Sequence, residues 1–449
     1  MTASELLAKY DVPIPRYTSY PTVPAWRTTP SPDAWRRSLA DGAAAGQAAL
    51  SIYVHLPFCE ALCSFCGCNT VTTRDHSRED PYVDLVLAEL AHYLRDAPDL
   101  AGVPVRQFHL GGGTPTFMAP AVLARLVDRV TAGLPRRGDD FEGAVEVDPR
   151  VTTRDHLQTL RRCGFTRLSL GVQDVDAGVQ HLVKRVQPIG QTAALCAIGR
   201  ELGYTSINLD LIYGLPGQTP ASMVRLAEAV IGLSPDRLAV YSFARVPWIK
   251  PAQRRFRDDQ IPVGADKRAL YEIIRARLIA AGYVEIGLDH FAHPTDALAQ
   301  AADRGVLHRN FMGYTDTSTS VLLGLGVSAI SETADCYHQN EKVLPVYEKR
   351  VLAGEVPTLR GHVLTAGDRR RRQIIASLMT RYRATLTADE LHAVRRQLDA
   401  LGADGLVSVD DLTVTVPPRG RPFLRHAAAV FDEHLERTRT GAPTYSTAV

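Results

Sequence analysis

Short segments rich in β-branched and aromatic residues alternate with longer amphipathic segments through the middle of the chain. The short segments predict six strands, at residues 49–55, 105–110, 143–148, 166–173, 206–214 and 237–243. The longer segments carry apolar residues at helical spacing, as in 82–96, 120–134 and 219–233. This alternation predicts an α/β fold in which a parallel sheet has helices on its outer side. Six repeats are too few for a complete barrel, so we expect a partial (β/α)6 barrel of TIM type.

The two ends of the chain have different patterns. Residues 1–47 are dense in proline and aromatic residues, which predicts an irregular arm with one helix at 32–45. Residues 307–331 predict a loop with a buried glycine-rich segment, and the helical patterns after them end in a short strand pair at 405–416. We therefore expect an arm (1–47), a barrel (48–300) and a smaller C-terminal helical domain of winged-helix type (301–449).

The composition is ordinary for a soluble globular protein, with 45% hydrophobic and 22% charged residues. A net charge of +2 gives no electrostatic reason to expect nucleic acid or an anionic membrane as a partner. We find no apolar run of roughly 18 residues, as a transmembrane helix requires, and no pattern of a secretory signal. We therefore expect a cytoplasmic protein, in which clustered cysteines indicate a metal site or catalysis rather than disulfides.

Polar and glycine-rich motifs lie at the ends of the first five predicted strands. In chain order they read HLPFC, GGGTPT, EVDPR, GVQD and DLIYGLP. The C-terminal ends of parallel strands meet at one end of a barrel, and barrel enzymes build their active sites there. The sequence therefore predicts one active site on one rim.

Four of the seven cysteines lie between positions 59 and 68. Cys59, Cys63 and Cys66 have the spacing C-x3-C-x2-C, and thiolates this close together select zinc or an iron–sulfur cluster. A structural zinc site usually needs a second pair of ligands, which is not obvious here. Three thiolates can hold a 4Fe–4S cluster and leave one iron open for chemistry. A zinc knuckle or chance buried thiols would not explain why this segment falls on the predicted rim.

With the aromatic Phe65 before its last cysteine, the motif resembles that of the radical S-adenosylmethionine (SAM) superfamily. In that superfamily SAM binds the open iron through its amino and carboxylate groups. An electron from the cluster then cleaves SAM to methionine and a 5′-deoxyadenosyl radical, which abstracts a substrate hydrogen. The resemblance implies a 4Fe–4S cluster on Cys59, Cys63 and Cys66, and a full or partial (β/α) barrel.

A closer resemblance covers essentially the whole chain. Seven motifs are similar, in order, to the HemN-type oxygen-independent coproporphyrinogen III oxidase family: PRYTSYPT (15–22), YVHLPFCEALCSFCGCN (53–69), HLGGGTPT (109–116), EVDPR (146–150), RLSLGVQD (167–174), INLDLIYGLPGQT (207–219) and HRNFMGYT (308–315). The resemblance implies a haem-biosynthetic reaction, the anaerobic oxidative decarboxylation of coproporphyrinogen III to protoporphyrinogen IX. It also implies a tetrapyrrole substrate, a reductant such as flavodoxin or ferredoxin, and an external electron acceptor. We expect a monomer.

The resemblance further implies two bound SAM molecules and the residues that contact them. For the SAM on the cluster, these are Tyr53, Gly112, Glu146 and Ile330. For the second SAM, they are Phe65, Gly113, Thr114, Gln173, Arg185, Asp210 and Ala244. Glu146 suits ribose hydroxyls, while Arg185 and Asp210 suit a carboxylate and an ammonium or ribose group. Taken singly, a glycine run also occurs in tight turns, and charged residues more often form surface ion pairs.

Three further residues are candidate catalytic or substrate-binding residues. The resemblance places Cys68 beside the cluster without ligating it, although a small buried residue would also fit this position. Arg16 and Tyr17 lie in the arm, which is near the active-site mouth in the family, and could bind propionates of the tetrapyrrole. Alternatively, the aromatic residues only hold the arm against the barrel. The haem-chaperone branch of the superfamily typically has an aromatic in place of Cys68 and lacks the arm, which argues against a non-catalytic haem-trafficking protein.

A few positions depart from the family pattern. Leu110 stands for a tryptophan, Arg245 for a histidine and Val321 for an aspartate, and residues 380–382 replace a CNF motif. These positions lie outside the predicted cluster and SAM residues, but several could touch the substrate pocket. A second function therefore stays open: a HemN-like methylase or cyclopropanase of natural-product biosynthesis, in which the second SAM donates a methylene radical to the substrate.

Overall fold

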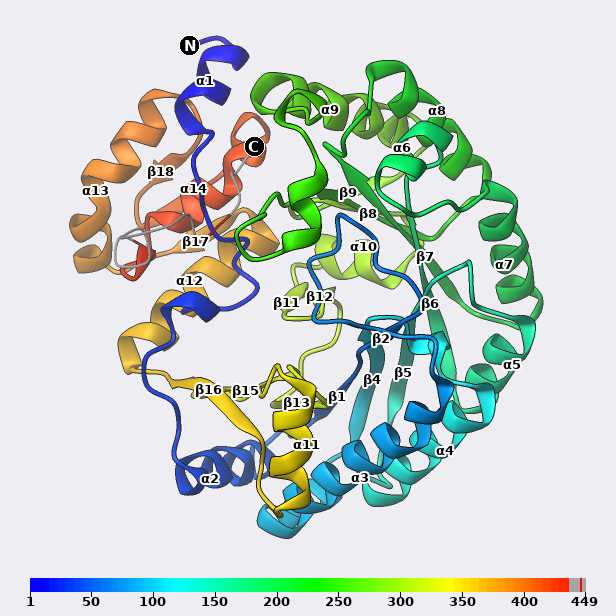
Figure 1. The fold of residues 1–449 in the computed structure, drawn as a ribbon. Coiled ribbons are helices and arrows are strands. Elements are labelled where there is room, and N and C mark those ends of the chain that lie inside the picture. Colours follow the sequence, from blue (N-terminus) through cyan, green and yellow to red (C-terminus); the bar gives the residue numbers. More distant parts are fainter. Residues whose placement is uncertain (436–444, 446–449) are drawn as a thin grey trace.

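A curved sheet of 12 strands forms the centre of the computed structural model, which describes residues 1–435 and 445 (Figure 1). The strand order is β16-β15-β14-β13-β1-β4-β5-β6-β7-β8-β10-β9. The six consecutive strands in the middle are parallel: β1 (Leu50–Leu56), β4 (Val105–Gly112), β5 (Arg137–Val147), β6 (Phe165–Gln173), β7 (Ser206–Tyr213) and β8 (Arg237–Ser242). They coincide with the six predicted strands and confirm the partial barrel.

Helices that connect these strands cover the outer side of the sheet (Figure 1). They are α3 (Glu79–Asp96), α4 (Pro120–Gly133), α5 (Arg154–Arg162), α6 (Ala177–Leu182), α7 (Ile189–Glu201), α8 (Pro220–Gly232) and α9 (Gly264–Ala280). Two of these helices begin at a capping threonine: the Thr153 and Thr219 hydroxyls accept hydrogen bonds from backbone N–H groups in the first turns of α5 and α8. All of these helices except α6 bury apolar residues in the core that includes the sheet; Leu126 and Val130 of α4, for example, are fully buried. Burying one such side chain contributes about 1.5–3 kcal/mol to folding.

The sheet continues beyond the parallel strands at both edges. Beside β1 lie β13 (Val321–Leu325), β14 (Ile330–Glu332), β15 (Cys336–Asn340) and β16 (Thr358–Val363); beside β8 lie β10 (His290–Ala292) and β9 (Val284–Ile286). The loop predicted for 307–331 is therefore wrong. Residues 321–325 form a strand that is parallel to β1 and fully buried, and such strands read as continuous apolar runs without alternation. Strands on both sides of residue 300 share this sheet, and the domain division at that residue stays a prediction.

The arm and the C-terminal domain pack together between the two edges of the sheet (Figure 1). The arm contains the predicted helix, α2 (Pro32–Ala43), and a second helix that was not predicted, α1 (Ala3–Tyr10). A capping box starts α1, in which the Thr2 hydroxyl accepts from the Glu5 N–H and the Glu5 carboxylate accepts from the Thr2 N–H. Tyr17 and Tyr20 of the arm are buried in the apolar core of the C-terminal domain.

The C-terminal domain combines helices with a small sheet, as the winged-helix pattern predicts. Its elements are α12 (Ala366–Arg381), β17 (Arg383–Thr385), α13 (Ala388–Ala403), β18 (Ser408–Asp410), β19 (Thr413–Thr415), η7 (Pro418–Phe423) and α14 (Leu424–Ala429). Shorter elements complete the fold: η1 (Val23–Ala25), β2 (Phe58–Cys59), β3 (Val71–Thr72), η2 (His76–Arg78), η3 (Pro98–Gly102), η4 (Pro115–Phe117), η5 (Pro251–Arg255), η6 (Asp258–Gln260), α10 (Ala297–Asp303), β11 (His308–Asn310), β12 (Gly313–Thr315) and α11 (Leu344–Leu352). Among the described residues, no helix is long and apolar enough to cross a membrane.

Candidate active site

The cysteine motif lies on the loop between β1 and α3, at the C-terminal end of the parallel strands. The Ser64 N–H donates to the Val183 carbonyl at 2.9 Å, which ties the loop to the segment after α6. The fully buried amide of Gln253 donates to the Phe65 carbonyl and to the Ala244 carbonyl, each at 3.1 Å. One side chain thus joins the cysteine loop to the loop after β8, and both segments are held in place.

A cavity of about 180 Å³ lies against this loop. Twelve of the residues predicted from the sequence line it: Cys59, Cys63, Phe65, Cys66, Cys68, Gly112, Gly113, Thr114, Glu146, Gln173, Arg185 and Asp210. They come from the cysteine loop, from the ends of β4, β5, β6 and β7, and from the segment after α6. The structure brings these residues together, and their individual roles stay predictions.

Two arginines surround the sulfur of Cys63. Arg150 Nη2 and Arg185 Nη1 each lie 3.5 Å from Cys63 Sγ. Both guanidinium groups also bind Asp148, at 2.6 and 2.9 Å, so the carboxylate fixes their orientation. A thiolate is the form of cysteine that binds metal, and these two cations would lie beside its negative charge.

The surroundings shift the pKa values of three of the four thiols, and they do so in different directions. A hydrogen bond from the Cys68 side chain lowers the pKa of Cys66 to about 6, although burial opposes the shift. The same hydrogen bond, together with burial, raises the pKa of Cys68 well above its usual value. Burial raises the pKa of Cys59 to about 11, and the Thr114 hydroxyl lies 3.4 Å from its sulfur. Cys59, Cys63 and Cys66 are free thiols on one loop beside two guanidinium groups, and this donor set fits a three-thiolate cluster site.

Glu146, at the end of β5, is oriented by two donors. His109 Nε2 lies 3.0 Å from its Oε1, and the Gly112 N–H donates to its Oε2 at 3.3 Å. Burial raises the pKa of Glu146, but the hydrogen bonds and the charge of His109 outweigh it, so that the net pKa lies below its usual value. The Tyr53 ring stacks on His109 with centroids 5.7 Å apart. The carboxylate is therefore ionised and positioned to accept hydrogen bonds in the cavity.

Asp210 of β7 presents a second carboxylate. Ser169 Oγ donates to it at 3.0 Å and Asn208 Nδ2 at 2.9 Å. Burial, followed by the negative charge of Glu146, raises the pKa of Asp210 to about 6. A cation in the cavity would stabilise the ionised form of both carboxylates.

Sequence reasoning did not assign roles to several residues that shape the cavity. Asp148, Arg150 and Ser169 line it together with the predicted residues. Asp148 and Arg150 belong to the EVDPR motif, so a signal for them was present in the sequence. Which members of the motif face the cavity depends on where β5 ends and the chain turns, and the motif alone does not show this.

The glycine run after β4 passes very close to the cysteine loop. A Cβ at Gly113 would lie 2.5 Å from the Pro57 carbonyl oxygen, and Gly112 has a φ of +118° that disfavours other residues. The Gly113 N–H donates to the Leu56 carbonyl at 2.8 Å. This close approach brings Gly112, Gly113 and Thr114 to the wall of the cavity.

Gly113→Ala should separate the two loops. The added methyl overpacks a backbone contact, which typically costs about 1–3 kcal/mol of stability, and should weaken SAM binding as well. Gly67→Ala is the matched control, because Gly67 lies in the cysteine loop and has open space around a built Cβ. Urea unfolding and SAM titration of both variants test this, and equal behaviour of the two would contradict it.

The remaining predicted residues lie outside this cavity. Ala244 shares the Gln253 amide with Phe65, as described above. Ile330 begins β14, and its carbonyl oxygen would lie 2.4 Å from a Cβ at Gly324. Tyr53 stacks on His109, which contacts Glu146, and the Tyr53 hydroxyl lies 3.0 Å from His55 Nδ1.

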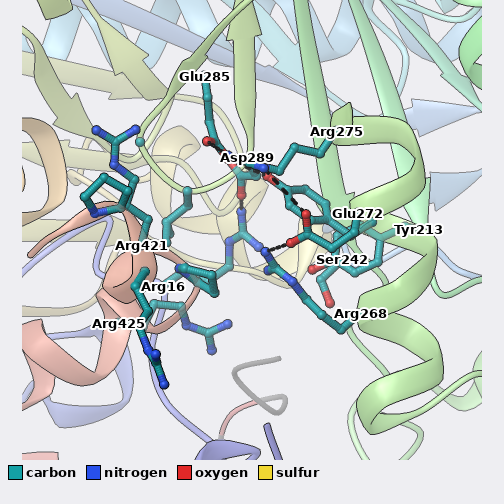
Figure 2. Close-up of a pocket in the computed structure, with 16 residues that line it drawn as sticks. Arg16, Tyr213, Ser242, Arg268, Glu272, Arg275, Glu285, Asp289, Arg421 and Arg425 are labelled. Carbon is teal, nitrogen blue, oxygen red and sulfur yellow. Dashed lines mark hydrogen bonds and ion pairs between the residues drawn. The ribbon is translucent and has the colours of Figure 1, made fainter. Parts of the chain in front are cut away.

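The two arm residues also lie elsewhere. Arg16 pairs with Asp289 and lines a second cavity, which is shown in Figure 2. The Tyr17 ring is 4% exposed and its hydroxyl donates to Asp432 at 3.0 Å. These contacts favour the alternative in which Tyr17 fixes the arm, and its substrate role stays a prediction.

The positions that depart from the family pattern are mainly structural. Val321 and Leu110 are fully buried in β13 and β4, where apolar residues belong. Arg245 pairs with the exposed Asp258, and Tyr382 ends α12 with its hydroxyl donating to the Gly287 carbonyl at 3.0 Å. That several of these positions touch the substrate pocket stays a prediction.

Comparison with known proteins adds to this geometry. Residues 53–230 match the family model of the radical SAM superfamily. Oxygen-independent coproporphyrinogen III oxidase from Escherichia coli is 41% identical over 442 residues, covering 96% of this chain and 95% of the relative. The chain belongs to the oxygen-independent coproporphyrinogen III oxidase family. Membership makes it a radical SAM oxidoreductase and implies a 4Fe–4S cluster and SAM as its cofactors.

Other relatives agree. The oxygen-independent coproporphyrinogen III oxidase from Pseudomonas aeruginosa is 38% identical over 447 residues, with 96% of each chain covered. The solved structure of coproporphyrinogen III oxidase (HemN) from Escherichia coli, a radical SAM enzyme, matches with a TM-score of 0.89 over 93% of this chain and 97% of that one. The fold class predicted from the sequence is thereby confirmed, including the helical C-terminal part.

Proposed function

We propose that this oxidase-family member converts two propionates of coproporphyrinogen III to vinyl groups, with loss of carbon dioxide, and so forms protoporphyrinogen IX. The observation that carries the proposal is the 41% identity to the Escherichia coli oxidase over 96% of the chain. That similarity includes the arm and the cysteine-rich loop as well as the barrel. The Pseudomonas aeruginosa relative, 38% identical over 96% of the chain, is also an oxygen-independent coproporphyrinogen III oxidase, which favours this function over the methylase or cyclopropanase.

In this proposal Cys59, Cys63 and Cys66 hold the cluster, and the guanidinium groups at Cys63 stabilise its negative charge. When bound, the cluster and SAM supply the radical that takes a hydrogen from the β-carbon of a propionate. Cys68 lies beside the three ligands without joining them. A flavodoxin- or ferredoxin-type protein is the proposed reductant, and an external acceptor takes the electron that leaves the substrate.

In this proposal the polar groups along the rim bind two SAM molecules. Glu146, held by His109 and Gly112, would accept hydrogen bonds from the ribose of the first. Arg185 and Asp210 would bind charged or hydroxyl groups of the second, with Gly113 and Thr114 forming its backbone wall. The Nε of Arg185 is buried without a hydrogen-bond partner among the described residues, and it is one donor still available there.

Binding of the second SAM should depend on pH through Asp210. Its pKa of about 6 means that it loses its negative charge as the pH falls from 7 to 5, and with it the attraction for an ammonium group. Because this pKa exceeds the usual 3.8, ionisation of Asp210 also lowers folding stability as the pH rises from about 4 to about 6.

Calorimetric SAM titrations of the cluster-loaded protein at several pH values measure the effect. We expect two SAM-binding steps for the wild type, and we expect the affinity of the weaker step to decrease as the pH falls below 6. In Asp210→Asn, this step should be weak at every pH. A wild-type profile without a step near pH 6 would contradict the assignment.

The reaction itself gives the decisive test. The cluster is reconstituted anaerobically, SAM, a chemical reductant and coproporphyrinogen III are added, and products are separated by chromatography. Protoporphyrinogen IX is expected, with one SAM cleaved for each propionate lost. SAM cleavage without this product would reject the oxidase function and favour the methylase.

A further inference from the structure

A second cavity, of about 140 Å³, lies between α9, the N-terminal arm and the segment 418–425 (Figure 2). Arginines dominate its wall: Arg16, Arg268, Arg275, Arg419, Arg421 and Arg425. They come from the arm, from α9 and from the C-terminal domain, and Figure 2 labels five of them, Arg16, Arg268, Arg275, Arg421 and Arg425. We call this space the arginine pocket. None of the residues predicted for the cluster or for SAM lines it.

The carboxylates in the wall are already paired. Glu285 receives two hydrogen bonds of 2.9 Å from Arg275. Glu272 pairs with Arg268, and Asp289 pairs with Arg16 (Figure 2). Among the described residues, Glu272, Glu285 and Asp289 are the acidic members of this wall, and none of them pairs with Arg419 or Arg421.

Arg419 and Arg421 have no anionic partner among the described residues. The Arg421 side chain has no hydrogen bond or ion pair in this part of the chain; its guanidinium group lies 4.4 Å from the centroid of the Tyr382 ring, and its Nε is buried without a partner. Arg419 donates only to a neutral acceptor in the described part of the chain, the Met1 carbonyl, at 2.9 Å. A buried donor without an acceptor costs free energy, and a bound anion would remove that cost.

Two neighbouring cations are affected by the same concentration of positive charge. Lys267 of α9 is 6% exposed, and burial, with Arg425 and Arg16 contributing, lowers its pKa to about 8. Burial and the charge of Arg16 lower the pKa of Arg425 to about 9. The protein thus concentrates positive charge here at a cost that an anionic ligand would offset.

The arginine pocket adjoins the cluster cavity along the same rim. Tyr213 and Ser242, at the ends of β7 and β8, line the pocket, while Asp210 of β7 lines the cluster cavity. Three residues along a strand span roughly 10 Å. Arg16 lies 5.4 Å from the centroid of the Tyr241 ring, the residue before Ser242. A ligand with several carboxylates around its edge could therefore reach both cavities.

We infer that the arginine pocket binds a carboxylate of the substrate, a propionate remote from the one that reacts, through Arg419 and Arg421. The inference rests on the proposed function and adds a site to it. Guanidinium groups bind carboxylates in a bidentate manner, which fixes the orientation of the ligand as well as its affinity. The pocket would thereby decide which propionate faces the radical.

Binding of coproporphyrin III, the stable oxidised tetracarboxylate, tests this without turnover. Fluorescence titration should give a Kd on the order of tenfold higher for Arg421→Gln than for the wild type, and higher still for Arg419→Gln/Arg421→Gln. Arg421→Lys keeps the charge and should recover part of the loss. Arg395→Gln is the matched control, because Arg395 pairs with Asp399 on the exposed face of α13 and should leave the Kd unchanged.

A tetramethyl ester of the same porphyrin serves as the second probe. It should bind the wild type and Arg421→Gln alike, because it offers no carboxylate. Equal Kd values for coproporphyrin III in the wild type and Arg421→Gln would overturn the inference, as would an equal loss with the ester. If the Kd depends on Arg421 but no protoporphyrinogen IX forms, the proposed function fails and the carboxylate site stands. If protoporphyrinogen IX forms but Arg421→Gln has the same Kd for coproporphyrin III as the wild type, the carboxylate site is rejected and the proposed function stands.

Discussion

Replacing Cys63 by alanine should abolish the broad visible absorption of the reconstituted protein and, with it, SAM cleavage. Cys63 is the buried member of the motif, and its sulfur lies 3.5 Å from both Arg150 and Arg185. Two remaining thiolates cannot hold a cubane cluster that depends on three protein ligands. Iron content, the visible spectrum and the yield of 5′-deoxyadenosine measure the effect.

Two other cysteines give the controls. Cys196→Ala removes a buried thiol on α7, away from the cavity, and should leave the spectrum unchanged. Cys68→Ala should retain iron but change turnover, because Cys68 lies beside the ligands. Retained iron and SAM cleavage in Cys63→Ala would refute the ligand assignment, and loss of iron in Cys68→Ala would show that four cysteines take part.

Glu146→Gln should weaken SAM binding while leaving the cluster in place. The carboxylate is ionised, and His109 and Gly112 hold it in position. Hydrogen bonds to a charged group contribute about 1.5–3 kcal/mol each, so the loss of charge should raise the Kd for SAM roughly ten- to a hundredfold. Equilibrium binding of SAM to the cluster-loaded protein measures this change.

Glu142→Gln is the matched control. Glu142 lies four residues earlier on β5, hence on the same face, but it pairs with Arg167 at 2.6 Å and does not line the cluster cavity. Its Kd for SAM should stay within a factor of two or so of the wild type. If both variants lose affinity for SAM equally, Glu146 affects SAM binding only through its negative charge inside the barrel, and it does not contact SAM.

The sequence predicted most of the barrel and the chemistry of its rim for identifiable reasons. Parallel strands separated by helices produce a strong alternation of short β-rich and long amphipathic segments. The three cysteines lie so close together in the chain that their spacing alone indicates a metal site. β13 was missed because its partner, β1, lies about 270 residues away in the chain, and a buried run such as 321–325 has no periodicity of its own. α1 was missed although Thr2 and Glu5 form a capping box, because the prolines after it dominate the pattern.

Contacts between segments that are far apart in the sequence could not be predicted, for a different reason. The grouping of Arg150, Arg185 and Asp148 around Cys63 depends on the segments after β1, β5 and α6, and no local pattern encodes their distances. The arginine pocket is the clearer case, since the arm, α9 and segment 418–425 supply it from widely separated parts of the sequence. Each arginine alone is typical of an exposed surface.

The packing of the arm on the C-terminal domain has a consequence for biosynthesis. Tyr17 donates to Asp432, and Arg425 donates to the carbonyls of Pro15 and Ile14, so the arm binds a segment that is synthesised about 400 residues later. The strands β1 to β16 can pair before that happens, but the arm reaches its place only after residues 425–432 have been synthesised. Until then Tyr17 and Tyr20 lack the apolar core of the C-terminal domain in which they are buried.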